Sequence, residues 1–166
     1  MSQAEEVERK FRLSQMPPSD LLVRGLRVEQ GYVVVDPGDL RIRRAAGIWS
    51  LTVTGDGDLT RGEWEPKDEE IGEWVGPLLW EHTVGARLEK TRYRVPYAGF
   101  VLEVDVFIGS LTGLILLECE FKGETTELAE EQARRFVLPP WASNAIDVTQ
   151  NPAYKNKSLA LKGLPV

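Results

Sequence analysis

Charged side chains recur at every second position in several short segments of the chain. The segment EVERKF begins the series with Glu6, Glu8 and Lys10. Sets with the same spacing follow in Arg41 and Arg43, in Arg61, Glu63 and Glu65, in Lys90, Arg92 and Arg94, in Glu103 and Asp105, and in Glu118, Glu120 and Lys122. Clustered carboxylates without histidine suit Mg²⁺ or Mn²⁺, and clustered arginine and lysine suit phosphate oxygens. A site that combined both would match phosphoryl transfer, which needs metal, positioned phosphates and neutralised charge.

The elements that would carry these charges are β-strands, because every second side chain of a strand points to one face of the sheet. Turn signals such as DPGD over 36–39 and GDGD over 55–58 separate the alternating segments. Helical spacing replaces the alternation over 67–81 and 123–138, and the loop-rich tail from 139 has room for a short helix near its end. We therefore expect a single domain over residues 1–166, with about eight antiparallel strands and two principal helices in an α+β arrangement.

The charged faces have two interpretations. In the first, they form a solvated exterior whose cross-strand ion pairs contribute about 0.2–1 kcal/mol each. In the second, the strands close into a barrel whose charged face lines the interior, while helices cover the apolar exterior. A charged lumen has to hold water, ions or a ligand, because unpaired buried charges are costly. Charge spacing alone leaves both interpretations open.

Composition narrows the class of protein. The 166 residues carry a net charge of −6, which disfavours a nucleic-acid partner. No apolar run reaches the ~20 residues that a membrane helix needs, and no secretory signal is visible, so we expect a cytoplasmic protein without membrane association. The lone Cys119 fits a reducing compartment and a core position. The lone His82 excludes HExxH-type zinc sites and most Ser-His-Asp chemistry.

The ordered series of motifs resembles that of the CYTH superfamily, the triphosphate tunnel metalloenzymes. The first-strand signature ExExK is present as Glu6-Val7-Glu8-Arg9-Lys10. The other matching motifs are, in order, LRIR, RGEWE, EKTRY, LEVDVF, ECEF and VTQNPAYKNKSLA. The series covers almost the whole chain at suitable spacing, so it favours the barrel interior as the place of the charged face.

The resemblance implies a closed eight-stranded antiparallel β-barrel, a tunnel with a charged lumen and helices packed on its outside. It also implies a divalent metal, Mg²⁺ or Mn²⁺, and a small triphosphate-containing molecule as substrate. The candidate metal ligands are Glu6, Glu8, Glu63, Glu65, Glu118 and Glu120. The candidate phosphate-binding residues are Lys10, Arg41, Arg43, Arg61, Lys90 and Arg92. The candidate catalytic residues are Lys10 and Tyr32, for proton transfer, and Glu118, which would orient or activate the attacking water.

Hydrolysis of inorganic tripolyphosphate to pyrophosphate and phosphate is the activity that the resemblance favours, by a monomer or a homodimer. Alternatives on the same tunnel are an adenylyl cyclase and a thiamine triphosphatase. A non-catalytic module that binds phosphate or polyphosphate is a further alternative. One departure encourages it, because relatives commonly have a tunnel lysine on the fourth strand where this chain has Thr54 in SLTVTG. We expect the loss of that phosphate contact to affect affinity and substrate length.

Overall fold

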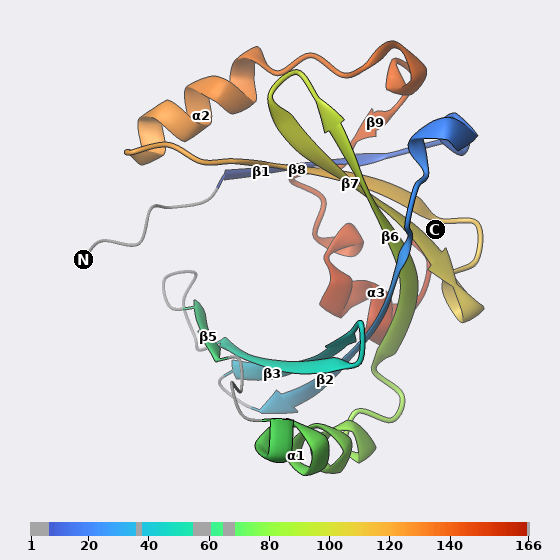
Figure 1. Cartoon of the computed structure of the whole chain (residues 1–166), viewed down its shortest axis with the longest axis vertical. Helices are drawn as coiled ribbons and strands as arrows, with labels where there is room; N and C mark the ends of the chain where they lie inside the picture. Colours follow the sequence, from blue (N-terminus) through green and yellow to red (C-terminus); the bar gives the residue numbers. More distant parts are fainter. Residues whose placement is uncertain (1–6, 36–37, 55–60, 65–68, 166) are drawn as a thin grey trace. The chain divides into compact units, whose positions relative to one another are not determined.

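The computed structural model describes residues 7–35, 38–54, 61–64 and 69–165 (Figure 1). The chain forms two compact units. The first unit consists of Met1–Gly25, Arg92–Val106 and Gly113–Asn151, and the second of Leu26–Thr91, Phe107–Thr112 and Pro152–Val166. Each unit therefore gathers segments that are far apart in the sequence.

Strands dominate both units, as the alternating pattern predicts. In the described residues, nine strands hydrogen-bond in the order β5-β4-β3-β2-β6-β7-β8-β1-β9. Their bounds are β1 Val7–Arg12, β2 Leu26–Val35, β3 Gly38–Ala45, β4 Ile48–Thr54, β5 Arg61–Trp64, β6 Arg87–Tyr97, β7 Phe100–Ile108, β8 Ile115–Phe121 and β9 Ile146–Asp147. Pairs such as β1–β8 and β2–β3 are antiparallel, which confirms the α+β class. β5 and β9 stand at the two ends of this order, and closure of the sheet into a barrel stays a prediction.

Three α-helices accompany the strands in the described part of the chain: α1 Glu69–Glu81, α2 Thr126–Arg135 and α3 Asn156–Lys162. The two helices predicted over 67–81 and 123–138 are thus confirmed, and α1 continues through Pro77. α2 begins after Thr125, whose side chain accepts a hydrogen bond from the Leu128 N–H and so satisfies one free helix donor. Across the described ranges, no helix has the length and apolar character that crossing a bilayer requires.

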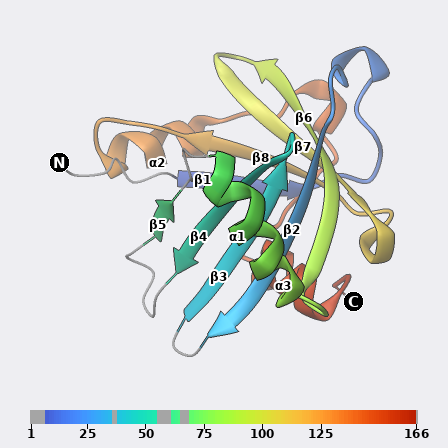
Figure 2. The same cartoon turned by 60° about the horizontal axis from the view of Figure 1, so that its bottom comes forward.

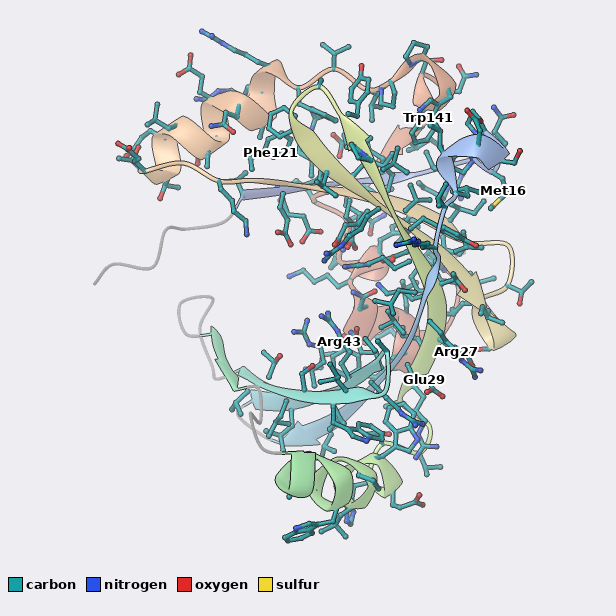
Figure 3. The ribbon with its side chains drawn as sticks, viewed as in Figure 1. Met16, Arg27, Glu29, Arg43, Phe121 and Trp141 are labelled. Atoms are coloured by element: carbon teal, nitrogen blue, oxygen red, sulfur yellow. The ribbon has the colours of Figure 1, made fainter. Side chains whose placement is uncertain are left out.

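The first unit separates its apolar and charged side chains onto opposite faces of the sheet. Phe11, Cys119 and Phe121 are almost fully buried and pack with Ala129 and Ala133 of α2. Phe121 lies between the sheet and α2 (Figure 3). Because side chains alternate along a strand, the charged residues of β1 and β8 occupy the other face. This arrangement confirms that Cys119 is a core residue, and burial raises the pKa of its thiol to about 11.

The second unit has the same separation around α1. The helix lies across β2, β3 and β4 (Figure 2), and the Trp49 and Trp80 rings meet with centroids 5.7 Å apart. Gly76 allows this close approach, because a Cβ there would collide with the Trp49 ring. Arg43 extends from the sheet face that α1 leaves uncovered (Figure 3).

α3 differs from the prediction that helices lie only on the apolar side. Figure 1 shows α3 on the face of the β2–β4 strands opposite α1, which is the face of Arg43. Leu159 of α3 is 1% exposed, and Asn156 accepts a hydrogen bond from Lys90 at 3.5 Å. The prediction of exterior helices is therefore wrong for α3, because Leu159 gives even this short, polar helix an apolar side to bury.

Candidate active site

Lys10 pairs with two carboxylates on the charged face of the first unit. The register sets Lys10 of β1 opposite Glu118 of β8, and Glu118 opposite Glu103 of β7. Lys10 Nζ lies 3.0 Å from Glu118 Oε1 and 3.2 Å from Glu8 Oε1. Burial by itself lowers the pKa of Lys10, but the carboxylates of Glu118 and Glu8 outweigh it and raise the pKa above its ordinary value. Lys10 is therefore a cation at neutral pH.

Arg92 joins three strands through a carboxylate cluster. Its guanidinium donates to both Asp105 oxygens at 2.7 and 2.6 Å, to Glu118 at 2.8 Å and also to Glu103. Asp105 is fully buried, and the bidentate geometry is the strong form of this pair. Burial alone lowers the pKa of Arg92, but Asp105, Glu118 and Glu103 raise it. The arginine predicted to bind phosphate thus has carboxylates around it in this structure.

The backbone of Lys10 is held by the segment 147–149. The Lys10 carbonyl accepts a hydrogen bond from the Val148 N–H at 2.9 Å, and the Lys10 backbone N–H donates to Thr149 Oγ1 at 3.0 Å. Arg9, which points to the other face, donates to Asp147 at 2.7 Å and to the Ala133 carbonyl at 3.1 Å. These contacts anchor the first strand, which the alternation of its own residues did not predict.

The second unit brings aromatic and cationic residues together on the face opposite α1. Cross-strand pairing places Tyr32 opposite Arg41, and Arg41 opposite Thr52. Arg41 donates to Thr52 Oγ1 at 2.7 Å, and Gln30 donates to the Tyr32 hydroxyl. Gln30 is itself opposite Arg43. Tyr32 and both predicted arginines therefore share one face, and Gln30 joins them as a residue that the sequence analysis missed.

Lys90 is fully buried in the second unit. Its Nζ lies 5.3 Å from the centroid of the Phe107 ring, in addition to its contact with Asn156 of α3. A cation over an aromatic face is favourable, which offsets part of the cost of burial. The alternation of EKTRY predicted the face of Lys90 but not the aromatic and helical cover above it.

Several predicted site residues lie at the limits of what the structure describes. The register pairs Thr52 with Glu63 and Thr54 with Arg61 through the backbones of β4 and β5. The side chains of Thr54, Arg61 and Glu63 lie outside the described part, as do Glu6 and Glu65 altogether. Their proposed roles stay predictions.

Comparison with known proteins decides the family. No protein-family model matches the chain. The inorganic triphosphatase of Nitrosomonas europaea is 39% identical over 160 residues, which are 94% of this chain and 97% of that protein. The chain belongs to the inorganic triphosphatase family.

Two further relatives agree with this assignment. The inorganic triphosphatase of Acetivibrio thermocellus is 33% identical over 158 residues, 93% of this chain and 92% of that protein. The crystal structure of the inorganic triphosphatase NE1496 has a TM-score of 0.69 at 33% identity and covers 99% of both chains. The CYTH resemblance that the sequence motifs carry is confirmed.

The candidate metal ligands of this inorganic triphosphatase family member have the oxygen donors that a hard cation requires. Glu8 and Glu120 face each other across β1 and β8, with side chains 42% and 47% exposed. Their oxygens are the ligands that Mg²⁺ and Mn²⁺ prefer. In the described ranges, no three His, Cys, Asp or Glu residues come together as a metal-binding group.

Proposed function

We propose that this protein hydrolyses inorganic tripolyphosphate to pyrophosphate and phosphate in a metal-dependent reaction. The relationship to the Nitrosomonas europaea inorganic triphosphatase carries this proposal, because it extends over 97% of that protein at 39% identity. The charged faces of the two units support it, since one offers carboxylates with Lys10 and Arg92, and the other offers Arg41 and Arg43. We propose in addition that the sheet closes into the eight-stranded tunnel expected of the family.

The cationic residues are assigned to phosphate binding. Lys10 keeps its proton beside Glu118 and Glu8, so its role is to donate hydrogen bonds to phosphate oxygens rather than to act as a general base. Arg41 and Arg43 supply guanidinium groups that match phosphate oxygens in shape and charge. These charges stabilise the negative charge that spreads over the transferring group.

The carboxylates are assigned to metal and water. Glu8 and Glu120, together with Glu6 and the glutamates of RGEWE, would hold a divalent cation. Held by these carboxylates, such a cation would supply positive charge that neutralises phosphate oxygens. Glu118 lies between Lys10 and Arg92, and we assign it to orienting the water for attack in line with the leaving group.

A substrate panel tests this function. Purified protein is given tripolyphosphate, ATP, thiamine triphosphate or longer polyphosphate with Mg²⁺, Mn²⁺ or a chelator, and released phosphate is measured. We expect orthophosphate release from tripolyphosphate that is fastest among the panel and requires the metal. With ATP, a cyclase would release pyrophosphate instead. Tight binding of tripolyphosphate without turnover under either metal would contradict hydrolysis and favour a binding module.

Glu118→Gln tests the site within the same assay. The change removes the negative charge but keeps the side-chain shape, so we expect kcat to fall by about 10²-fold or more. Glu124→Gln is the matched control, because Glu124 is exposed and lies outside the charged face. Full activity of a folded Glu118→Gln variant would overturn the site assignment.

A further inference from the structure

Gln30 is a fully buried amide on β2 whose side chain donates from Nε2 to the Tyr32 hydroxyl. The two residues are separated by Gly31 and therefore share one face of the strand. Tyr32 is itself only 6% exposed. Burying an amide is costly unless its hydrogen bonds are made, so the hydrogen bond to Tyr32 offsets part of the cost of burying Gln30.

The backbone around Gln30 and Tyr32 is fixed from the opposite face. A Cβ on Gly31 would lie 2.5 Å from Thr83 Oγ1, so only glycine allows β2 to seat against Thr83. Thr83 is fully buried and donates to the Trp80 carbonyl at 2.7 Å. The Tyr32 N–H donates to the Ala86 carbonyl at 3.0 Å. The two side chains therefore start from a rigid strand, which suits precise positioning.

The direction of the hydrogen bond sets what the Tyr32 hydroxyl can do. Because Gln30 is the donor, the Tyr32 oxygen accepts there, so the Tyr32 O–H can donate only to some other acceptor. A donor on the phenol oxygen also stabilises the phenolate that forms when the proton leaves. The amide of Gln30 thus favours Tyr32 as a proton donor.

The oxygen atom of the Gln30 amide suits a hydrogen-bond donor such as water better than it suits phosphate. Among the described residues, Gln30 Oε1 is buried without a hydrogen-bond partner. Phosphate oxygens accept hydrogen bonds, as Oε1 does, so only a donor such as water satisfies it. The amide therefore directs its donor to Tyr32, and its oxygen can only accept from a donor.

We propose that Gln30 is a positioning residue that orients Tyr32 and stabilises its phenolate during triphosphate hydrolysis. The proposal rests on the proposed hydrolysis of tripolyphosphate and on the role in proton transfer that the family resemblance implies for Tyr32. Among the described side chains, the elements packed against β2 carry Arg41 and Arg43 of β3, Lys90 of β6, and Lys157 and Lys162 of α3. These are all cations that also favour a phenolate, so a neutral substitution at Gln30 isolates the contribution of the amide.

An absorbance titration of the phenol tests the first half of the proposal without any assay of activity. The absorbance of Tyr32 is obtained by subtraction: each protein is titrated beside a second version that also carries Tyr32→Phe, and the difference between the two curves belongs to Tyr32. In Gln30→Met, which keeps the length but removes the donor, we expect the midpoint to rise by about one pH unit. Glu29→Gln, a neighbour on the other face of β2, should leave the midpoint unchanged. An unchanged midpoint in a folded Gln30→Met variant overturns the proposal.

A double-mutant cycle on kcat tests the second half. We expect Gln30→Met to lower kcat for tripolyphosphate by about tenfold with little change in KM, because the substrate contacts remain. In the Tyr32→Phe background the same substitution should have no further effect. Additive losses would show that Gln30 acts without Tyr32 and would contradict the proposal. A wild-type protein without activity would refute the proposed function, while the titration would still decide whether Gln30 controls the Tyr32 phenol.

Discussion

Arg92 sets one guanidinium against three carboxylates that have little contact with water. Asp105 is fully buried, and the side chains of Glu118 and Glu103 are 9% and 15% exposed. Removal of one partner from such a cluster leaves charge without compensation in a low dielectric. The stability of this carboxylate cluster therefore depends on Arg92, whatever Arg92 binds during turnover.

Arg92→Gln tests that dependence. We expect the free energy of unfolding to fall by about 3 kcal/mol, because Asp105 loses its bidentate partner. The matched control is Arg94→Gln, two residues along the same strand, whose side chain is 73% exposed. Its pair with Glu103 is solvated, so the expected loss is below about 1 kcal/mol. Urea unfolding measures both losses. Equal losses would show that the buried cluster contributes no more to stability than the exposed pair of Arg94 with Glu103.

The segment 146–149 pairs with β1 and holds its end in place. β9 pairs with the end of β1, and Asp147 binds both Arg9 and the Thr149 side chain, at 2.7 and 2.6 Å. Burial raises the pKa of the Asp147 carboxyl, but hydrogen bonds from Arg9 and Thr149 outweigh it and hold the pKa below its ordinary value. A carboxyl whose pKa is lowered by folding stabilises the fold at pH values above its pKa in the unfolded chain. That stabilisation is lost as the pH falls through the lowered pKa of the folded state.

Asp147→Asn should therefore destabilise the protein in a pH-dependent way. At neutral pH we expect the variant to unfold at lower urea concentration than the wild type. The gap should close as pH falls below about 4, because the wild-type carboxyl then takes up a proton. Urea midpoints across this range check the prediction. Glu130→Gln, which removes only an exposed helix pair with Arg134, should show a small gap throughout. A gap for Asp147→Asn that persists undiminished at low pH would contradict the assignment.

The whole molecule is built from two units that share β6 and β7. The boundary between the units falls within each strand, after Thr91 in β6 and after Val106 in β7. Breaking either strand would disrupt hydrogen bonds in both units, which favours cooperative unfolding. The prediction of a single domain over residues 1–166 therefore has a direct test.

Two local reporters can follow the units separately. Cys119 is fully buried in the first unit, so pulsed thiol labelling reports when that unit opens. In a Trp141→Phe variant, the tryptophans that remain, including Trp49 and Trp80, belong to the second unit, so their fluorescence reports that unit. We expect both signals to change at the same urea midpoint. Labelling of Cys119 at clearly lower urea would show two independently folding domains.

Short-range patterns in the sequence were enough to predict much of this protein. Alternation identified the strands and the side-chain parity of Lys10 and Glu118, and helical spacing identified α1 and α2, because both signals arise within a few residues. ExExK and the motifs after it were enough to suggest the superfamily. The type of chemistry, which combines carboxylates with basic groups and has only one histidine in the whole chain, also followed from the spacing of the charges and the composition.

Which of these groups meet depends on contacts between segments that are far apart in the chain. Lys10 and Thr149 are 139 residues apart in the chain yet share a hydrogen bond. The bidentate pair of Arg92 with Asp105, the cover of Lys90 by Phe107 and Asn156, and the hydrogen bond from Gln30 to Tyr32 depend on side-chain packing. Local alternation fixes the face of a residue, but register and packing fix its neighbours, and these arise from the chain as a whole.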